Sequence, residues 1–298
     1  LDVHRDIIVA CLAKGELGTD PEIEIRSFST LIPEMQKLRD WVLEADCHHV
    51  AMESTGIYWQ PIYEMLELCF DGQINILVVN ARHMKNVPGR KTDMRDAQWI
   101  ATLLRAGLLK GSFIPDKTFR ELRHLTRYRK SIVHDITAQK NRIDKFLQSS
   151  GFRFAAFLSD TFGASGRNII RHLMEYGSIS REALDKCLKT QTRKRIDEIL
   201  IALNGSLSEH QRGFLRMIFE HLEALEQHRH SVENAIAEEI TKHEKALSLL
   251  CSIPGIDVTA AAAIIAEIGT DMSAFPDSQH ICSWAGLSPG NNESAGKR

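Results

Sequence analysis

The chain has 298 residues, of which 43% are hydrophobic and 26% are charged, and its formal net charge is −2. These values are ordinary for a soluble globular protein with room for two domains, or for one domain and a helical insertion. The longest mostly apolar run, Ala260 to Ala266, is far shorter than the roughly 20 residues of a membrane span, which excludes a membrane protein.

The first part of the chain alternates between predicted strands and helices. Leu1–Ala13 is rich in β-forming residues, and Glu22–Phe28 alternates with the period of a strand that has one solvent-exposed face. Thr30 is expected to cap a helix that runs to about Ala45. This order of elements predicts a mixed sheet with helices packed on it, an α/β fold. Further strands are predicted at His49–Met52 and Ile74–Val79, and further helices at Ile57–Phe70 and Asp93–Leu109.

From Lys117 to about Lys245 the sequence is almost entirely helical. Two series of positions, spaced alternately by three and four residues, are each apolar at six of eight places, which predicts two long helices with coiled-coil-like seams. The two helices could pack on each other or on a second subunit, and the sequence leaves both open. Gly151–Thr192 between them is predicted to form shorter helices. The seam positions are 122, 125, 129, 132, 136, 139, 143 and 146 in the first series, and 215, 218, 222, 225, 229, 232, 236 and 239 in the second.

A last compact segment begins near Leu247. Its sequence Ile253-Pro-Gly255-Ile resembles the turn of a helix-hairpin-helix. Glycine permits the tight turn, and the N–H groups at the start of the following helix can hold a DNA phosphate. The alternative is a turn that only packs two helices together. The predicted domains are therefore 1–112, 113–246 and 247–298.

Neither end of the chain resembles a natural end. The chain opens without Met in what reads as the middle of a strand, and it closes in a polar loop. We therefore expect a fragment of a longer protein, truncated in its last domain. No charged leader precedes an apolar stretch, so nothing in the sequence indicates secretion. The six scattered cysteines include no C-x-x-C pair and predict reduced thiols of a cytosolic protein, not a disulfide framework or a zinc site.

Basic residues are concentrated in one region. Between Ala81 and Arg153 there are 17 Lys or Arg against 6 Asp or Glu, whereas Ser206 to Lys245 holds 8 acidic against 5 basic residues. A nearly neutral protein with one basic stretch is typical of a confined phosphate-binding surface. A solvated helix face is the alternative. The expected phosphate contacts are Arg82, Lys85, Arg90, Lys91, Arg120, Arg123, Arg127 and Arg129.

Four carboxylates are candidates for a metal site. Asp2 lies in the first predicted strand, Glu53 ends a later strand, and Asp93 and Asp96 are three residues apart on one face of a helix. Carboxylates gathered in this way repel one another unless a hard divalent cation such as Mg²⁺ neutralises them. A pair of such ions can activate a nucleophile and stabilise the leaving oxygen of a phosphodiester. Each residue taken alone could instead be an ordinary surface acid or, for Asp93, a helix-dipole partner.

Several segments resemble one family in that family's own order. Leu1-Asp-Val-His4, Met52-Glu-Ser-Thr-Gly-Ile-Tyr-Trp59, Val79-Asn-Ala-Arg-His83 and Lys91-Thr-Asp-Met-Arg-Asp-Ala97 resemble the DEDD insertion-sequence transposases, the "IS one-ten" family that includes the Piv DNA invertase. Near the other end, Ile253-Pro-Gly-Ile, the segment from Phe275 through Trp284-Ala-Gly-Leu-Ser-Pro, and Ser294-Ala-Gly-Lys297 resemble the same family's transposase domain.

The resemblance implies a RuvC-like, RNase H-type domain in which Asp2, Glu53, Asp93 and Asp96 carry Mg²⁺. It further implies that Ser294 is a nucleophile that holds DNA covalently, so that the bond energy is kept for rejoining. Homo-oligomers (dimers or tetramers), in which one subunit's metal site meets another subunit's serine, and guidance by a structured bridge RNA are also implied. A guide RNA would carry the specificity by base pairing. A bacterial cytoplasmic, nucleoid-associated location follows from the same resemblance.

The chain departs from the family pattern in three ways. Ala295 stands where many relatives have Gly, which could tighten the turn that holds Ser294, and the helical region between the two halves is long. The helix that usually follows the serine loop is missing, so a protein that ended at Arg298 is expected to be inactive. His4 and His83 flank the carboxylates and could ligate a metal or orient a carboxylate, and Tyr58 and Trp59 could stack on a base, although a structural role is the more common one for each. Two further hypotheses remain: a junction-resolving nuclease that uses water, and a non-catalytic nucleic-acid scaffold.

Overall fold

The computed structural model describes residues 1–16, 18–54, 56–70, 73–80 and 93–287. Side chains of 70 and 93–95 are outside this description, although their backbone belongs to helices. The chain divides into two compact units, Leu1–Ile114 and Pro115–Arg298.

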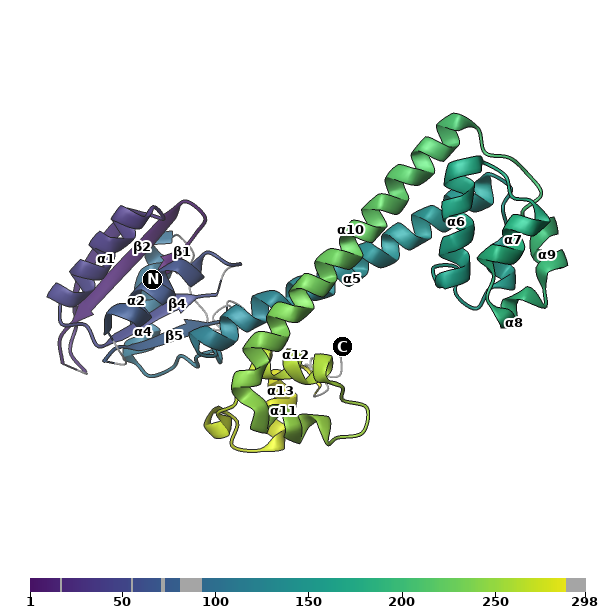
Figure 1. Ribbon diagram of the computed structural model, residues 1–298. Coiled ribbons are helices and arrows are strands. Elements are labelled where there is room, and N and C mark those ends of the chain that lie inside the picture. Colours follow the sequence, from purple (N-terminus) through teal and green to yellow (C-terminus); the bar gives the residue numbers. More distant parts are fainter. Residues whose placement is uncertain (17, 55, 71–72, 81–92, 288–298) are drawn as a thin grey trace, which may run out of the picture. The chain divides into compact units, whose positions relative to one another are not determined.

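The first unit is built on two small sets of paired strands (Figure 1). Strands β1 (Asp2–Val3), β2 (Ile7–Lys14) and β3 (Glu22–Ser29) are antiparallel in the order β1-β2-β3, and β4 (His49–Glu53) runs parallel to β5 (Asn75–Val79). The Leu1 nitrogen donates to the Ala51 carbonyl oxygen at 2.6 Å, so β1 lies beside β4. The β-rich segment predicted at Leu1–Ala13 thus holds two strands, because the chain turns after Val3.

Three helices pack on these strands. They are α1 (Ile32–Glu44), α2 (Trp59–Phe70) and α4 (Asp93–Arg105). The predicted Thr30 cap is wrong: the residue before α1 is Leu31, and the Thr30 hydroxyl donates to the Arg5 carbonyl at 2.9 Å instead. Helix α1 buries one apolar stripe, as an amphipathic helix on a core must. The fully buried core side chains include Ile8, Leu38, Met52, Ile62, Leu66 and Ile100.

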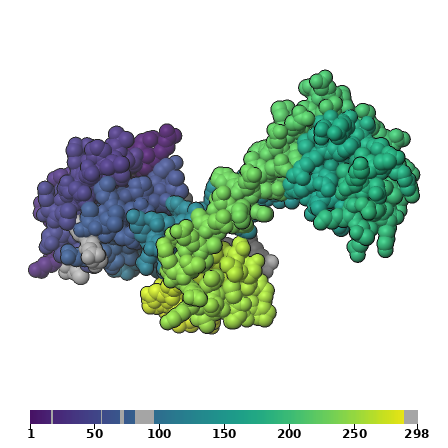
Figure 2. All heavy atoms as spheres, viewed as in Figure 1, coloured from purple at the N-terminus to yellow at the C-terminus, as the bar shows by residue number. Residues whose placement is uncertain are grey.

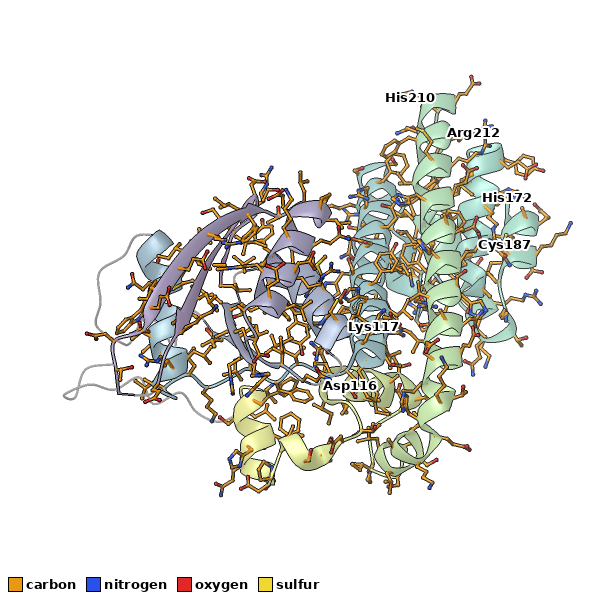
Figure 3. All side chains as sticks on the ribbon, turned by 90° about the vertical axis from the view of Figure 1, so that its left-hand side faces the viewer. Asp116, Lys117, His172, Cys187, His210 and Arg212 are labelled. Carbon is orange, nitrogen blue, oxygen red and sulfur yellow. The ribbon has the colours of Figure 1, made fainter. Side chains whose placement is uncertain are left out.

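Two long antiparallel helices, α5 (Lys117–Ser149) and α10 (Glu209–Ile240), form the axis of the second unit (Figure 1). Early residues of one meet late residues of the other: Phe146 packs on Phe214, and Arg129 pairs with Glu233. Figure 3 shows the same arrangement, with Lys117 and Arg212 near opposite ends of the pair. Both predicted seams are therefore confirmed as buried faces, and the helices pack on each other within one chain. The seam residues that are buried are Leu122, Ile132, Ile136, Gln139, Ile143, Leu215, Ile218, Leu222, Val232 and Ile236.

Short helices connect the far ends of this pair. They are a 3-10 turn (Phe154–Phe157), α6 (Ala164–Tyr176), α7 (Arg181–Cys187), α8 (Thr190–Arg193) and α9 (Ile196–Ala202). They share one apolar core with the long helices, in which Phe152, Phe154 and Phe219 are almost completely buried. The guanidinium of Arg212 donates to the Met174 carbonyl at the end of α6, so α10 also closes that helix.

Gly166 is the tightest point of this short-helix bundle. A Cβ atom at this position would lie 1.9 Å from the Thr161 carbonyl oxygen, which is backbone and cannot move aside cheaply. We expect Gly166→Ala to destabilise the second unit by about 3 kcal/mol, the upper range for overpacking. The matched control is Gly213→Ala on α10, where no atom lies within 4 Å and alanine is the better helix former by about 0.8 kcal/mol. Thermal unfolding followed by circular dichroism measures both, and equal melting temperatures would contradict the packing argument.

The chain ends in a third group of helices (Figure 1). A 3-10 turn (Thr241–His243) leads into α11 (Glu244–Cys251), α12 (Val258–Ile268), a second 3-10 turn (Met272–Ala274) and α13 (Ser278–Trp284). Helix α12 packs on α5 and buries Ala262, Ile265 and Ala266 in the core of the unit. Among the described residues, no helix is both long enough and apolar enough to span a membrane.

Candidate functional site

Among the predicted site residues whose side chains the structure describes, Asp2 is the most buried. It lies on β1 opposite Val9 of β2 and is only 3% exposed. One oxygen, Oδ2, is 3.1 Å from Nε2 of His4, which lies two residues further along the same segment. A carboxylate in such a place needs compensation for the water it has lost. His4 supplies part of it and orients the carboxylate.

Glu53 and Asp96 share the electrostatic environment of Asp2. Glu53 ends β4, Asp96 lies in the first turns of α4, and both side chains are half-buried. Burial raises the pKa of Asp2, and the negative charges of Glu53 and Asp96 raise it further, while His4 acts in the opposite direction. Glu53 and Asp96 thus lie close enough to Asp2 for their charges to act on its carboxylate.

The fold explains why residues so far apart in sequence meet. Strand β1 lies beside β4, and α4 packs on β1, β2 and β4. Three buried residues on one side of α4, Ala97, Ile100 and Leu103, fix the face that this helix presents to the strands. Asp93 begins α4, one helical turn before Asp96, but its side chain lies outside the described residues.

The donor set fits a divalent cation in its chemistry. Carboxylate oxygens are the ligands that Mg²⁺ prefers, and a buried Asp2 beside two like charges is an arrangement that a cation would relieve. Among the side chains that the structure describes, however, no three Asp, Glu, His or Cys residues are placed so that they could hold one ion together. Glu53, Asp96 and Asp2 are therefore neighbours rather than a formed metal cage.

Several predicted site residues lie outside the described part of the chain. They include the nucleophile candidate Ser294, the histidine His83, and the basic loop residues Arg82, Lys85, Arg90 and Lys91. The two aromatic residues that follow Glu53, Tyr58 and Trp59, lie within the described residues. Trp59 is buried and packs edge-on against Tyr63 at 5.6 Å between ring centroids, so it belongs to the core, whereas Tyr58 is 38% exposed.

The four predicted phosphate-binding arginines of α5 all have partners within the protein. Arg120 is buried and donates to the Pro115 carbonyl at 2.9 Å. Arg123 donates to the backbone carbonyls of Ala266 and Glu267, and burial lowers its pKa. Arg120 could contact a phosphate only if its side chain became exposed. Arg123, Arg127 and Arg129 could do so only if each exchanged its carboxylate partner for the phosphate. The carboxylate partners are Glu267 for Arg123 and Arg127, and Glu233 for Arg129.

The turn between α11 and α12 has the glycine conformation that the sequence predicts. Gly255 has a φ of +90°, in the region that favours glycine, and a Cβ there would meet no atom within 4 Å. The first turn of α12 already has an acceptor, because the Asp257 carboxylate accepts from the Ala260 N–H at 2.7 Å. A phosphate at this helix start would share it with an acidic side chain, a feature that the sequence analysis missed.

Glu267 and Glu233 were missed as well. Each contacts an arginine more than 100 residues away, at 2.8 Å between Arg127 Nε and Glu267 Oε1 and at 2.7 Å between Arg129 Nη2 and Glu233 Oε1. Local sequence contains no signal for such a pair, since it forms only when α10 and α12 pack on α5. The two predicted seams were the one available clue, because antiparallel packing of one seam on the other places residues near 230 beside residues near 130.

Comparison with known proteins gives two family matches. Residues 1–151 match the model of the DEDD transposases of the IS110 type, described as "Transposase", and residues 247–298 match the "Transposase IS116/IS110/IS902 family". A curated relative from Streptomyces coelicolor, "Insertion element IS110 uncharacterized 43.6 kDa protein", is 26% identical over 222 residues. That alignment covers 68% of this chain and 53% of the relative, so the chain spans about half the length of the relative it matches.

Proposed function

Because the chain belongs to the DEDD transposase family of the IS110 type, we propose that it cuts and rejoins the DNA of a bacterial insertion sequence. The carboxylates Asp2, Glu53, Asp93 and Asp96 form the catalytic metal site in this proposal. The observation that carries it is the burial of Asp2 beside Glu53 and Asp96, at the place where β1, β4 and α4 meet. Isolated buried carboxylates raise the free energy of the fold, so this grouping is best explained by a functional role.

The strand arrangement supports an RNase H-like domain. The orders β1-β2-β3 and β4-β5, together with β1 beside β4, give the sequence β3-β2-β1-β4-β5 across the unit, with the first three strands antiparallel and the last two parallel. Asp2 then lies on the central strand and Glu53 at the end of its neighbour. Asp96 reaches them from a helix on the face of the strands.

The chain's own residues have distinct tasks in the proposed reaction. Asp2, fixed by His4, is the anchoring oxygen ligand, and Glu53 and Asp96 complete the set with Asp93. A bound Mg²⁺ would neutralise the carboxylates and stabilise charge at the phosphodiester. Ser294 is proposed as the nucleophile: its Oγ gives up its proton and bonds to the phosphorus, while the 3′ or 5′ oxygen of the cut strand leaves and takes up a proton. A DNA hydroxyl then attacks the same phosphorus, the serine oxygen leaves and is protonated again, and the strand is rejoined. The energy of the phosphodiester is kept in the serine–DNA bond.

Further assignments are part of the proposal. The match to residues 247–298 supports a second catalytic segment that contains Ser294. A bridge RNA and a homo-oligomer that joins the carboxylates of one subunit to the serine of another are carried over from the family resemblance, as is the nucleoid-associated location. The helix-hairpin-helix interpretation of α11 and α12 rests on the Gly255 turn. Sequencing the RNA that co-purifies with the protein tests the guide directly, and recovery of only random cellular RNA would reject it.

Metal-dependent strand cleavage is the test of the whole proposal. We expect wild-type protein, extended to the full length of its relatives, to cut insertion-sequence DNA with Mg²⁺ and not with EDTA. Glu53→Gln keeps the size of the side chain but removes its charge, and we expect it to slow cleavage by about a hundredfold or more, the usual effect of losing one group that stabilises transition-state charge. Glu44→Gln, an exposed acid at the end of α1, is the matched control. Equal rates for the two variants would refute the carboxylate site.

A further inference from the structure

A basic segment, residues 186–195, begins in the last turn of α7 and runs through α8. Its sequence, Lys-Cys-Leu-Lys-Thr-Gln-Thr-Arg-Lys-Arg, holds five cations and no carboxylate. The short helices α6 to α9 to which it belongs form a compact, rounded body around one end of the long pair α5 and α10 (Figure 2). All five cationic side chains of the segment are exposed. The segment lies between the two stretches that match the family models, residues 1–151 and 247–298.

The backbone of the basic segment is held in place by the helices before it. The Lys189 N–H donates to the Ser165 hydroxyl at 3.0 Å, which ties the segment to the start of α6. The Arg193 guanidinium donates to the carbonyls of Asp185, at 2.9 Å, and Leu188, at 3.3 Å, which ties it to the end of α7. Because this backbone is already ordered, a partner that binds the segment does not have to supply the free energy of ordering it.

Two of the five cations have a carboxylate partner, and three do not. Arg193 Nε lies 2.9 Å from Asp185 Oδ1, and Arg195 Nη2 lies 2.7 Å from Glu198 Oε2. The side chains of both pairs are about half exposed, and ion pairs of this kind contribute little to stability. The cations that form no ion pair with any residue the structure describes are Lys186, Lys189 and Lys194.

The neighbouring acids leave an excess of positive charge. Residues 180–198 contain six cations and four acids. Three ion pairs account for three of each, since Asp197 pairs with Arg181. The fourth acid, Glu182, lies in the first turn of α7, the helix end that favours negative charge, and hydrogen bonds from its own backbone N–H and from Ser180 lower its pKa. Three lysines therefore stand against one carboxylate, which leaves two positive charges in excess.

The fold gives a structural reason for only one of the three lysines. Lys186 lies in the last turn of α7, where the helix dipole favours a cation. Lys189 instead immediately precedes α8, at the helix end where a cation is disfavoured. Lys194 stands between Arg193 and Arg195, and adjacent like charges repel one another. A negatively charged partner would relieve both arrangements.

The uncharged residues of the segment indicate which kind of anion it fits. Leu188 is 4% exposed and Cys187 is partly buried, so the segment offers no apolar face that a lipid bilayer could bury. It also contains no aromatic residue on which an unpaired base could stack. Thr190 and Gln191 are exposed and add neutral donors of the kind that contact phosphate oxygens. These features fit the phosphate backbone of a duplex, whose bases are already stacked.

We propose that the basic segment binds the phosphate backbone of duplex DNA outside the stretch that is cut, with Lys189 and Lys194 as phosphate contacts. The contact is independent of base sequence, because these side chains meet phosphates and not base edges. The inference rests on the proposed function, which makes DNA the substrate. It assigns to the short-helix bundle the holding of DNA, a task separate from the carboxylate chemistry of the first unit.

The salt dependence of DNA binding tests the proposal. Fluorescence anisotropy of a labelled duplex, in EDTA and over a series of KCl concentrations, measures it with protein extended to the full length of its relatives. We expect Lys189→Ala with Lys194→Ala to weaken binding by about tenfold and to lower the slope of log affinity against log salt by about two, one for each lost contact. The matched control is Lys14→Ala with Lys145→Ala, which removes the same charge from exposed positions on β2 and α5 and should leave the slope unchanged.

A charge-preserving pair separates the role of the charges from that of the local structure. Lys189→Arg with Lys194→Arg keeps both positive charges, so we expect affinity within about twofold of wild type. Melting temperatures from circular dichroism should be equal for all variants, because the replaced side chains are exposed. The proposal is overturned if the alanine pair binds DNA as the control pair does, or if the arginine pair loses as much affinity as the alanine pair. A loss of affinity for duplex RNA but not for duplex DNA would assign the segment to RNA and also overturn it.

The failure of this proposal is distinct from the failure of the proposed function. If the alanine pair and the control pair bind DNA alike while Glu53→Gln stops cleavage, the basic segment has been assigned wrongly and the transposase proposal stands. If the alanine pair loses affinity as expected while Glu53→Gln cleaves normally, the carboxylate site fails and the DNA contact stands.

Discussion

Asp2→Asn is expected to abolish Mg²⁺-dependent strand exchange while it stabilises the metal-free fold. Asparagine has the same shape but cannot provide the anionic oxygen that a hard cation prefers. We expect the rate to fall by at least about a hundredfold, as for loss of a group that stabilises transition-state charge. Quantification of recombined plasmid DNA against time measures it. Asp93→Asn, at the start of α4, should have a comparable effect.

The stability change follows from the pKa of Asp2. Burial raises this pKa above its ordinary value of 3.8, so the folded protein retains the proton to higher pH than the unfolded chain. Between the unfolded and the folded pKa, the folded state binds more protons, and stability must fall as the pH rises through this window. The asparagine does not titrate and avoids that loss. At neutral pH in EDTA we therefore expect a higher melting temperature for Asp2→Asn than for wild type.

Magnesium should reverse the order of the two melting temperatures, so that wild type unfolds at a higher temperature than Asp2→Asn. A ligand that binds only the folded state raises its stability by mass action, and only wild type retains the full carboxylate set. Differential scanning calorimetry with and without Mg²⁺ makes the comparison, with Glu44→Gln as a control on an exposed acid at the end of α1. If wild type gains nothing from Mg²⁺, or if Asp2→Asn exchanges strands normally, the metal-site proposal is wrong.

The fold was predictable where hydrophobic periodicity decides it. The seams on α5 and α10 were predicted from spacing, and the same positions, such as Ile136 and Leu222, are buried. What spacing could not decide was the partner. Two apolar stripes can bury each other equally well within one chain or between two chains. In this chain, the short helices between α5 and α10 turn the chain back and bring α10 onto α5. The Thr30 cap failed for a related reason, since its hydroxyl found a tertiary acceptor at Arg5.

For the candidate site too, the sequence identifies residues but not the long-range contacts that they make. Asp2, Glu53 and Asp96 could be proposed from the sequence because each belongs to a recognisable local pattern, and in the fold the packing of β1, β4 and α4 places Glu53 and Asp96 near Asp2. The basic residues of α5 were also visible in the sequence, but their state was not. Charge counts report how many arginines there are, whereas Glu267 and Glu233 reach them from positions more than 100 residues away. In the structure, the arginines on this basic face of α5 therefore form ion pairs with carboxylates of α10 and α12.

Ser294→Ala is expected to remove a covalent protein–DNA adduct completely. In the proposed reaction the serine oxygen is bonded to the DNA phosphate between cutting and rejoining, so alanine leaves no atom that could form this bond. Loss of a serine nucleophile commonly costs on the order of 10⁴–10⁶ in rate. Denaturing gel electrophoresis of protein extended to the full length of its relatives, trapped with labelled DNA, shows the adduct as a band of retarded mobility. Ser288→Ala, in the same C-terminal segment, is the control.

The adduct experiment also separates the serine mechanism from a water mechanism. If Ser294→Ala still cuts DNA with Mg²⁺ and neither protein forms an adduct, the carboxylates act as a junction-type nuclease with water as nucleophile. If the adduct persists in Ser294→Ala, another residue is the nucleophile. Combining Ser294→Ala with Asp2→Asn subunits tests the oligomer: recovery of strand exchange in the mixture requires that one subunit supplies carboxylates and its partner the serine. Mixed subunits that remain inactive, while each variant still binds DNA, would place both groups in a single subunit.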